Sequence, residues 1–527
     1  MEERIKYITG KFANLQNVRR QYETLWDKCA ELCAVDSKIY IFTEDGKVQQ
    51  NIFDSTAANA LQTFTASMKS LICPTNQTYH RLKITNPKIA ENDEYRSYVE
   101  YANDLLFKFR YANGSGFSSE ANLLLQSLGV VGHRAWLMED RLQSGFLYRA
   151  IPVREIYAAA NEFNKIDTIY REFEITAAQA VREFKHKTPQ GIIAEAEKNP
   201  DRKFKFLHAV EPRSDRKPKY KDSLNMPIAS YNVWLDEDEL IYESGYRVMP
   251  YQMPRYSPRD NSAYSHSPAS QAFFDILSCN EMGKTFLRVG QLQANPALLT
   301  SLLSGASRAG SPGAIIKDGL TGDGKPRIVP MNYGGNLPIT QEMQDKIRDA
   351  IDNAFLKHLF LSLAQTPQMT AQEVLERKAE RGVLLAPQSE SVTSEWLFGN
   401  VMCELDALGA RGLLDNVPDE LFYDGSISLE METPAVHMQN AGKIRGLYKT
   451  IEASMTLAQS DNSVLDVVDY NAAIREIAAY EGAPNKIIRS KQAESMLQQQ
   501  KAEASQAQAL LQAAPVISKS IKDLSNA

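Results

Sequence analysis

The chain has 527 residues, of which 43% are hydrophobic and 24% charged, a composition that suits a globular protein with several cores. Its formal net charge of −6 argues against a sequence-independent DNA-binding protein, because such proteins usually present a basic surface. The sequence has no run of about eighteen apolar residues and no signal peptide, so we expect no membrane association.

The first half of the chain predicts long helices followed by a sheet. Apolar residues at helical spacing predict helices over 1–34, 56–68, 93–111, 120–131 and 176–184. Alternating or β-rich segments predict strands at 76–83, 134–138, 145–149, 156–160, 166–174, 204–210, 231–235 and 240–242. This order of elements indicates an α+β class that is mostly helical.

The composition changes abruptly in the middle of the chain. Ser267 and Pro268 predict the start of a helix that extends to about residue 294. From Asn295 to Pro338, closely spaced glycines and prolines exclude a long helix and allow only short strands and turns. Thr340 predicts the cap of a second helix. The chain therefore goes out along one helix, forms a glycine-rich excursion and comes back along another.

The C-terminal part is predicted to be helical. Thr370 and Glu373 have the spacing of a capping box, in which a hydroxyl and a carboxylate satisfy each other's backbone donors. Further helices are expected at 391–408, 434–458 and 465–480. Residues 484–514 have strong helix propensity but a thin apolar face, so this segment needs copies of itself or another partner, or is partly disordered.

No constellation of residues predicts an enzyme. The seven histidines are scattered, and no GxxxxGK[ST] phosphate loop occurs. We interpret the glycine-rich run Gly319–Lys325 as a turn-rich loop and the acidic run Asp236–Glu239 as a solvated hairpin turn. The five cysteines are expected to be buried reduced thiols rather than zinc ligands. We therefore expect no catalytic residue, no metal and no cofactor.

Basic residues on the two central helices allow two interpretations. These residues are Lys284, Arg288, Lys346, Arg348 and Lys357. One interpretation is a solvated helix face that is balanced by nearby carboxylates. The other is a helix pair that lines something anionic, because local positive charge in an acidic chain permits weak phosphate contact. The sequence leaves both open.

Several short motifs follow one another in a characteristic order between residues 15 and 415. They are Tyr22–Thr24, Asp54–Thr56, Leu71–Pro74, Pro250–Arg255, Asp275–Met282 and Pro367–Val374. In order and spacing, the chain resembles the portal, or head-to-tail connector, proteins of short-tailed double-stranded DNA bacteriophages.

The resemblance implies a portal fold that assembles as a dodecameric ring around a central channel. It divides the chain into a wing (1–267), stem helix 1 (268–294), clip (295–339), stem helix 2 (340–357), tunnel loop (358–369), tunnel helix and wing return (370–433), crown (434–483) and a C-terminal Ala/Gln-rich helix (484–527), which is a barrel-like extension or partly disordered.

The resemblance also implies roles for individual residues. The candidates for lining the DNA channel are Lys284, Arg288, Lys346, Arg348 and Lys357. The candidates for the tunnel loop are Phe360, Leu361, Leu363, Gln365 and Thr366. The candidates for docking terminase and adaptor at the clip are Arg308, Lys317, Lys325 and Arg327. Thr370 and Glu373 cap the tunnel helix.

The implied function is a channel at one capsid vertex through which double-stranded DNA is packaged and ejected. The implied partners are further copies of the chain, double-stranded DNA, the major capsid protein, scaffold, the terminase large subunit, and tail adaptor or nozzle proteins. We expect the protein in the virion and, during assembly, in the host cytoplasm. Two alternatives are another virion structural protein, such as a tail adaptor or an ejected internal protein, and a nucleic-acid enzyme.

Overall fold

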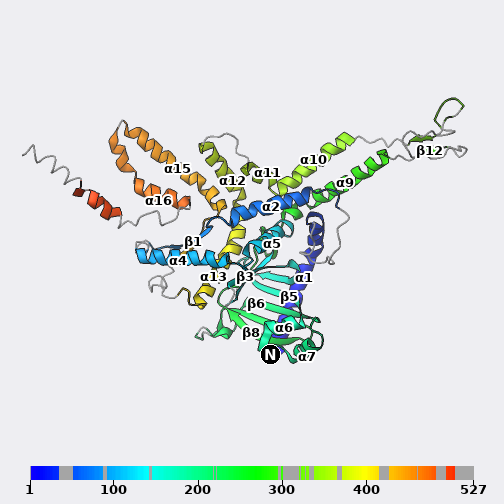
Figure 1. Ribbon diagram of the computed structural model, residues 1–527, viewed down its shortest axis with the longest axis horizontal. Coiled ribbons are helices and arrows are strands. Elements are labelled where there is room, and N and C mark those ends of the chain that lie inside the picture. Colours follow the sequence, from blue (N-terminus) through cyan, green and yellow to red (C-terminus); the bar gives the residue numbers. More distant parts are fainter. Residues whose placement is uncertain are drawn as a thin grey trace, which may run out of the picture.

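The structure is a mostly helical α+β arrangement, seen in a computed structural model (Figure 1). It describes residues 2–34, 52–86, 89, 92–141, 145–217, 219–220, 222–294, 298–300, 320, 322–326, 328–330, 337–364, 371–414, 427–459, 461–481, 494–501 and 503–504. Within these ranges, no helix combines the length and the apolar character that a membrane crossing requires.

Four long helices form the N-terminal part of the described chain, as predicted. They are α1 (Glu2–Cys33), α2 (Thr56–Ile72), α4 (Asp93–Arg110) and α5 (Phe117–Val130). α5 begins three residues earlier than predicted, directly after Gly116 and without a side-chain cap. The φ angle of Gly116 is 73°, a left-handed conformation that favours glycine.

The largest sheet has five antiparallel strands in chain order. They are β4 (Ile156–Ala160), β5 (Ile166–Thr176), β6 (Lys203–Pro212), β7 (Ile228–Trp234) and β8 (Glu239–Tyr246). The acidic run is the turn between β7 and β8, as predicted. Between β5 and β6 lie α6 (Ala177–Phe184), which was predicted, and α7 (Gln190–Lys198), which was not.

Smaller sheets join distant parts of the chain. β2 (Ala135–Arg141) pairs with the predicted partner β3 (Gly145–Ile151) and also with β9 (Tyr251–Gln252). β1 (His80–Ile84) pairs with β14 (Ile427–Met431), and β10 (Ser257–Arg259) pairs with β11 (Ser262–His266). β9, β10, β11 and β14 were not predicted.

The central stretch differs from its prediction at several boundaries. Its elements are α8 (Pro268–Gln271), α9 (Phe273–Ala294), β12 (Leu298–Thr300), β13 (Ile328–Pro330), α10 (Leu337–Ala354) and α11 (Lys357–Ala364). Ser267 caps α8 as predicted, but the helix is interrupted at Ala272. Thr340 lies inside α10 and is not its cap. Leu356 has a φ angle of 57°, which ends the helical run and separates α10 from α11.

Helices dominate the C-terminal part. They are α12 (Ala371–Val392), a single π-helical segment (Thr393–Leu397), α13 (Phe398–Ala410), α15 (Pro434–Ala458) and α16 (Tyr470–Tyr480). Thr433 caps α15 through the backbone N–H of Val436. Thr370 lies outside the described residues, so the expected capping box with Glu373 stays a prediction. Of the Ala/Gln-rich segment, residues 494–501 and 503–504 are described and helical.

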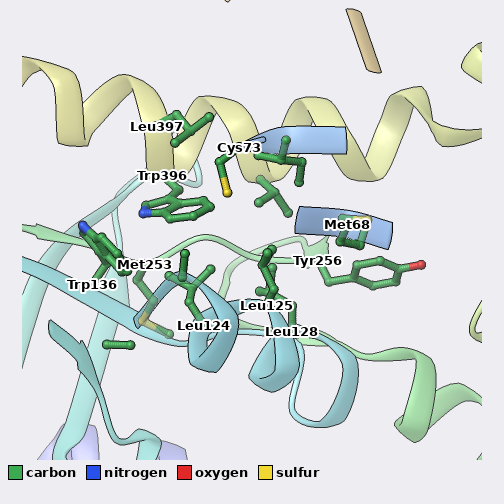
Figure 2. Close-up of a cluster of buried hydrophobic side chains, with 14 of the residues drawn as sticks. Met68, Cys73, Leu124, Leu125, Leu128, Trp136, Met253, Tyr256, Trp396 and Leu397 are labelled. Atoms are coloured by element: carbon green, nitrogen blue, oxygen red, sulfur yellow. The ribbon is translucent and has the colours of Figure 1, made fainter. Parts of the chain in front are cut away.

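The main core joins the segments before and after the central stretch. In Figure 2, Leu124 and Leu128 of α5 face Trp396 and Leu397 of the π-helical segment. A second cluster packs α1 against one part of the five-stranded sheet, and a third packs α6 and α7 against another part. All five cysteines are buried and free, as expected, and burial raises the pKa of the Cys29 thiol to about 12.

Candidate functional site

The two central helices lie side by side and project away from the five-stranded sheet. Figure 1 shows α9 and α10 leaving the body together, with β12 beyond them. β12 and β13 pair in antiparallel register from Leu298 opposite Pro330 to Thr300 opposite Ile328. The two ends of the glycine-rich excursion are therefore joined at the far end of the helix pair, in agreement with the predicted out-and-back path.

The segment before α2 holds α9 at its base. The backbone N–H of Phe53 donates to the side-chain oxygen of Asn280 at 2.7 Å. A Cβ atom on Gly283, one turn further along, would lie 3.0 Å from the carbonyl oxygen of Phe53. This approach is tighter than an ordinary contact, so a side chain at residue 283 would require the Phe53 backbone to shift by a few tenths of an ångström.

The same segment holds α10 through Asp54. Its carboxylate accepts hydrogen bonds from the Arg348 guanidinium at 2.8 and 3.1 Å and from the backbone N–H of Thr56 at 2.9 Å. Burial alone would raise the pKa of Asp54, but the hydrogen bonds from Thr56 and Arg348 outweigh it and hold the pKa below its usual range. Arg348, a predicted channel-lining residue, is therefore bound to the body of its own subunit.

Three other predicted channel-lining cations have carboxylate partners close in sequence. The Lys284 ammonium lies 3.8 Å from Glu281, and the Lys346 ammonium lies 3.0 Å from Glu342. The Lys357 ammonium lies 2.7 Å from Asp352. Because Leu356 separates α10 from α11, Lys357 lies in a different helix from Lys346, although the predicted second stem helix (340–357) contained both.

Arg288 differs from these four cations. It is exposed on α9, and no carboxylate in the described ranges lies within ion-pairing distance of it. Glu281, Lys284 and Arg288 follow Leu277 at steps of three or four residues, so all four side chains share one face of the helix. Arg288 is consequently the predicted cation with the greatest freedom to meet an external anion.

Large apolar side chains are also exposed on the helix pair. Phe274 is 77% exposed and Leu287 is 55% exposed on α9, and Met343 is 56% exposed on α10. Burying such side chains is favourable by about 1.5–3 kcal/mol each. Several large apolar groups left exposed on one projecting pair of helices suit an interaction surface.

The structure describes only part of the predicted tunnel-loop set. Phe360 and Leu361 lie in the helix α11 rather than in a loop, and Leu363 belongs to the same helix. Phe360 is 4% exposed and its ring packs against Phe64 at 6.3 Å, whereas Leu361 is 43% exposed. The prediction of a loop is therefore wrong for residues 358–364. Gln365 and Thr366 lie outside the described residues.

Most of the predicted clip-docking residues are likewise outside the described ranges. Arg308, Lys317 and Arg327 fall there, whereas Lys325 is described and exposed. Lys325 follows the turn at 322–324, which agrees with the interpretation of this run as a turn-rich loop. Among the described residues, no group of three or more His, Cys, Asp or Glu side chains could hold a metal ion.

Comparison with known proteins identifies the family. The family model of the bacteriophage head to tail connecting protein matches residues 6–488. The chain belongs to this family. Portal proteins are structural, non-enzymatic components of the virion, so the expectation that the chain is not an enzyme and the resemblance drawn from the motifs are both confirmed.

Two relatives agree with this assignment. The chain is 25% identical over 430 residues to the "Probable portal protein" of Bordetella phage BPP-1, which covers 79% of this chain and 76% of the relative. It is 22% identical over 531 aligned positions to the "Portal protein" of Salmonella phage epsilon15, which covers 98% of this chain and 95% of the relative.

Sequence reasoning found the helix pair but missed the residues that fix its base. Asp54 was named as part of a short motif, and neither Asn280 nor Gly283 was singled out. The sequence did mark Asn280 and Gly283 as unusual, because a polar residue and a glycine interrupt the buried face of an otherwise regular helix. Their partner could not be identified, since Phe53 lies more than two hundred positions away in the chain.

Proposed function

We propose that this portal protein forms a ring of identical subunits around a channel through which double-stranded DNA is packaged and ejected. The observation that carries the proposal is the projecting α9–α10 pair, with Phe274, Leu287 and Met343 exposed in a single subunit. Head-to-tail contacts that close into a ring would cover these side chains in every subunit at once. The net charge of −6 suits a conduit that lets DNA pass without holding it.

The regions of the ring follow from the family resemblance. In this proposal, residues 1–267 form the wing, α9 and α10 form the stem, and residues 295–339 form the clip. α11 and residues 365–369 lie at the tunnel, α12 is the tunnel helix, and α15 and α16 belong to the crown. The clip would dock the terminase during packaging and tail adaptor proteins afterwards, while the ring sits among capsid protein and scaffold at one vertex.

Mass measurement and electron-microscopy class averages of the purified full-length protein test the proposal. We expect a closed ring with a central channel at micromolar concentration, with twelve subunits as the family resemblance implies. If the protein, alone or coexpressed with scaffold, gave only monomers, the proposal would fail. A ring inserted at a procapsid vertex would also exclude a tail adaptor or an ejected internal protein.

A pair of matched substitutions tests whether Phe274 of α9 lies in the interface between subunits. Phe274→Ser should lower the fraction of protein in rings, because it removes an apolar side chain that the ring would bury. Phe163→Ser is the control, since Phe163 is 74% exposed at a hairpin between β4 and β5, away from the helix pair. Equal ring fractions for the two variants would exclude Phe274 from the interface.

A further inference from the structure

A basic surface lies on the α6–α7 hairpin, which has no role in the proposed channel. Residues 177–205 contain seven Lys and Arg against four Asp and Glu, so this segment has a net charge of +3 in a chain whose net charge is −6. Five of the cations are exposed and have no carboxylate of the described ranges within ion-pairing distance. They are Arg182, Lys185, Lys187, Lys198 and Lys203. We call them the basic α6–α7 surface.

This surface is built on a rigid support. Phe184 of α6 and Ile192 of α7 are buried against the sheet, where the same cluster includes Trp234. The turn between the helices is also fixed, because the carbonyl oxygen of Lys185 accepts from both the hydroxyl and the backbone N–H of Thr188, at 2.8 and 3.2 Å. Because the backbone that carries these cations is already ordered, less conformational entropy is lost when they bind an anion.

Three of these cations form two groups at opposite ends of α6, Lys203 alone at one end and Lys185 with Lys187 at the other. The backbone N–H of Ala177 donates to the carbonyl oxygen of Arg202 at 2.8 Å, and Thr176 pairs with Lys203 across the sheet. Lys203 therefore lies beside the first turn of α6, whereas Lys185 and Lys187 directly follow its last turn. An eight-residue helix is about 12 Å long, so about this distance separates the two groups along the helix.

That separation matches the spacing of phosphates across a DNA groove. The major groove of B-form DNA is about 12 Å wide and has a phosphate backbone along each edge. Cations whose backbone positions lie about 12 Å apart can therefore each reach one backbone of the same duplex. A flexible acidic peptide has no fixed spacing that would require two such groups.

We propose that the basic α6–α7 surface contacts the backbones of duplex DNA on the outside of the protein, away from the channel. In Figure 1, α6 and α7 lie at the bottom of the view, whereas α10 and β12 lie at the top. The contact does not read sequence, because it reaches only phosphates. The acidic remainder of the chain does not cancel the local field, since charges act over about 10 Å at 0.1 M salt.

The proposal rests on the proposed function only in that a DNA channel brings duplex DNA to the protein.

A fourfold charge reversal, K185E/K187E/K198E/K203E in the full-length chain, tests the DNA contact by fluorescence anisotropy with a short labelled duplex. The control is K108E/K165E/K219E/K449E, which changes the net charge equally at exposed lysines that lie in other parts of the fold. A second variant, with glutamine at the same four positions as the first, keeps the test valid if charge reversal impairs folding.

We expect the K185E/K187E/K198E/K203E variant to bind duplex DNA at least about tenfold more weakly at low salt. The steepness of its plot of log K against log salt concentration should fall by about four. The control should change binding less than about threefold. Equal losses in the two sets, or no binding of the duplex by the unmodified protein at low salt, would overturn the proposal. Displacement of the duplex by polyglutamate at matched charge would also overturn it, in favour of an acidic protein partner. Electron microscopy of the same samples reports ring formation separately, so the ring and the DNA contact can fail independently.

Discussion

Asp54 binds Arg348 and so makes this candidate cation less available for contact with DNA than the others. Its side chain is only 6% exposed, and Arg348 is its sole cationic partner among the ion pairs of the described residues. A buried carboxylate that loses its partner keeps the full desolvation penalty. Arg348 therefore has a structural role at the base of the α9–α10 pair, whatever else it meets in an assembled ring.

Arg348→Ala should lower the free energy of unfolding by about 1–3 kcal/mol, because it leaves the buried Asp54 carboxylate without a counter-charge. Lys346→Ala is the matched control on the same helix. The Lys346–Glu342 pair is more than 70% exposed on both sides, so its loss should change stability by less than about 1 kcal/mol. Urea unfolding monitored by circular dichroism measures both, and equal effects would contradict the structural role.

Arg288 and Lys346 are the better candidates for contact with DNA in the proposed channel. Both are exposed, and among the described residues the ion-pair partner found for either is the solvent-exposed Glu342. The double variant Arg288→Gln with Lys346→Gln should form rings normally but change the fraction of packaged DNA retained in heads, because it removes two positive charges without disturbing a buried contact. Loss of rings in this variant would show that these residues belong to the subunit interface instead.

At the scale of elements, α9 combines two glycines in different surroundings. Gly283 faces the Phe53 backbone, whereas a Cβ atom on Gly290 would meet nothing within 4 Å. The first glycine permits the close packing of α9 against the segment before α2. The second only weakens the helix, since glycine is less favourable than alanine in a helix by about 1 kcal/mol.

Gly283→Leu and Gly290→Leu should therefore have opposite effects on stability. The first should destabilise the protein by about 1–3 kcal/mol, because the new side chain overlaps the Phe53 backbone. The second should leave stability unchanged or raise it by up to about 1 kcal/mol. Thermal unfolding at a fixed protein concentration compares them, and destabilisation by Gly290→Leu would indicate that this face of α9 is covered by another subunit.

Local signals in the sequence predicted most helices but not the distant pairings. The start of α6 was predictable because Thr176 and Gln179 form a capping box within one turn. β14 was not, since its strand partner is β1, about 340 positions earlier in the chain. The break at Leu356 was also hidden, because leucine rarely adopts a left-handed conformation and only tertiary packing enforces it. The site's cations and nearby balancing carboxylates were found in advance, but Asp54 as the partner of Arg348 required the fold.

At the scale of the whole molecule, a buried ionic network ties the parts of the chain that flank the central excursion. Arg110 of α4 and Glu404 of α13 form an ion pair with neither side chain exposed to solvent. Tyr148 of β3 donates to the same carboxylate at 2.5 Å, and Asn400 donates to it at 2.6 Å. With its charge and hydrogen bonds satisfied, the network fixes how the segments before and after the excursion meet.

Three buried histidines make the stability of this fold sensitive to acid. Burial lowers the pKa of His133, with a further contribution from Arg19 and Arg255, to about 3. Burial together with Arg171 lowers the pKa of His208 to about 3, and burial with Arg110 lowers that of His80 well below 6.5. Each of these histidines therefore stays neutral in the folded chain at a pH where the unfolded chain binds a proton.

The free energy of unfolding should consequently fall as the pH drops below about 6.5, with each buried histidine contributing a slope of about 1.4 kcal/mol per pH unit. The loss from a given histidine ends once its folded form also takes up a proton, near pH 3 for His133.

His133→Leu should reduce the slope between about pH 6 and pH 5, a window in which most carboxylates remain ionised. Exposed His186 provides the control, because His186→Leu removes no buried ring. Urea unfolding at constant protein concentration across this window measures the slopes, and an unchanged slope in His133→Leu would mean that His133 takes up its proton in the folded protein as readily as in the unfolded chain.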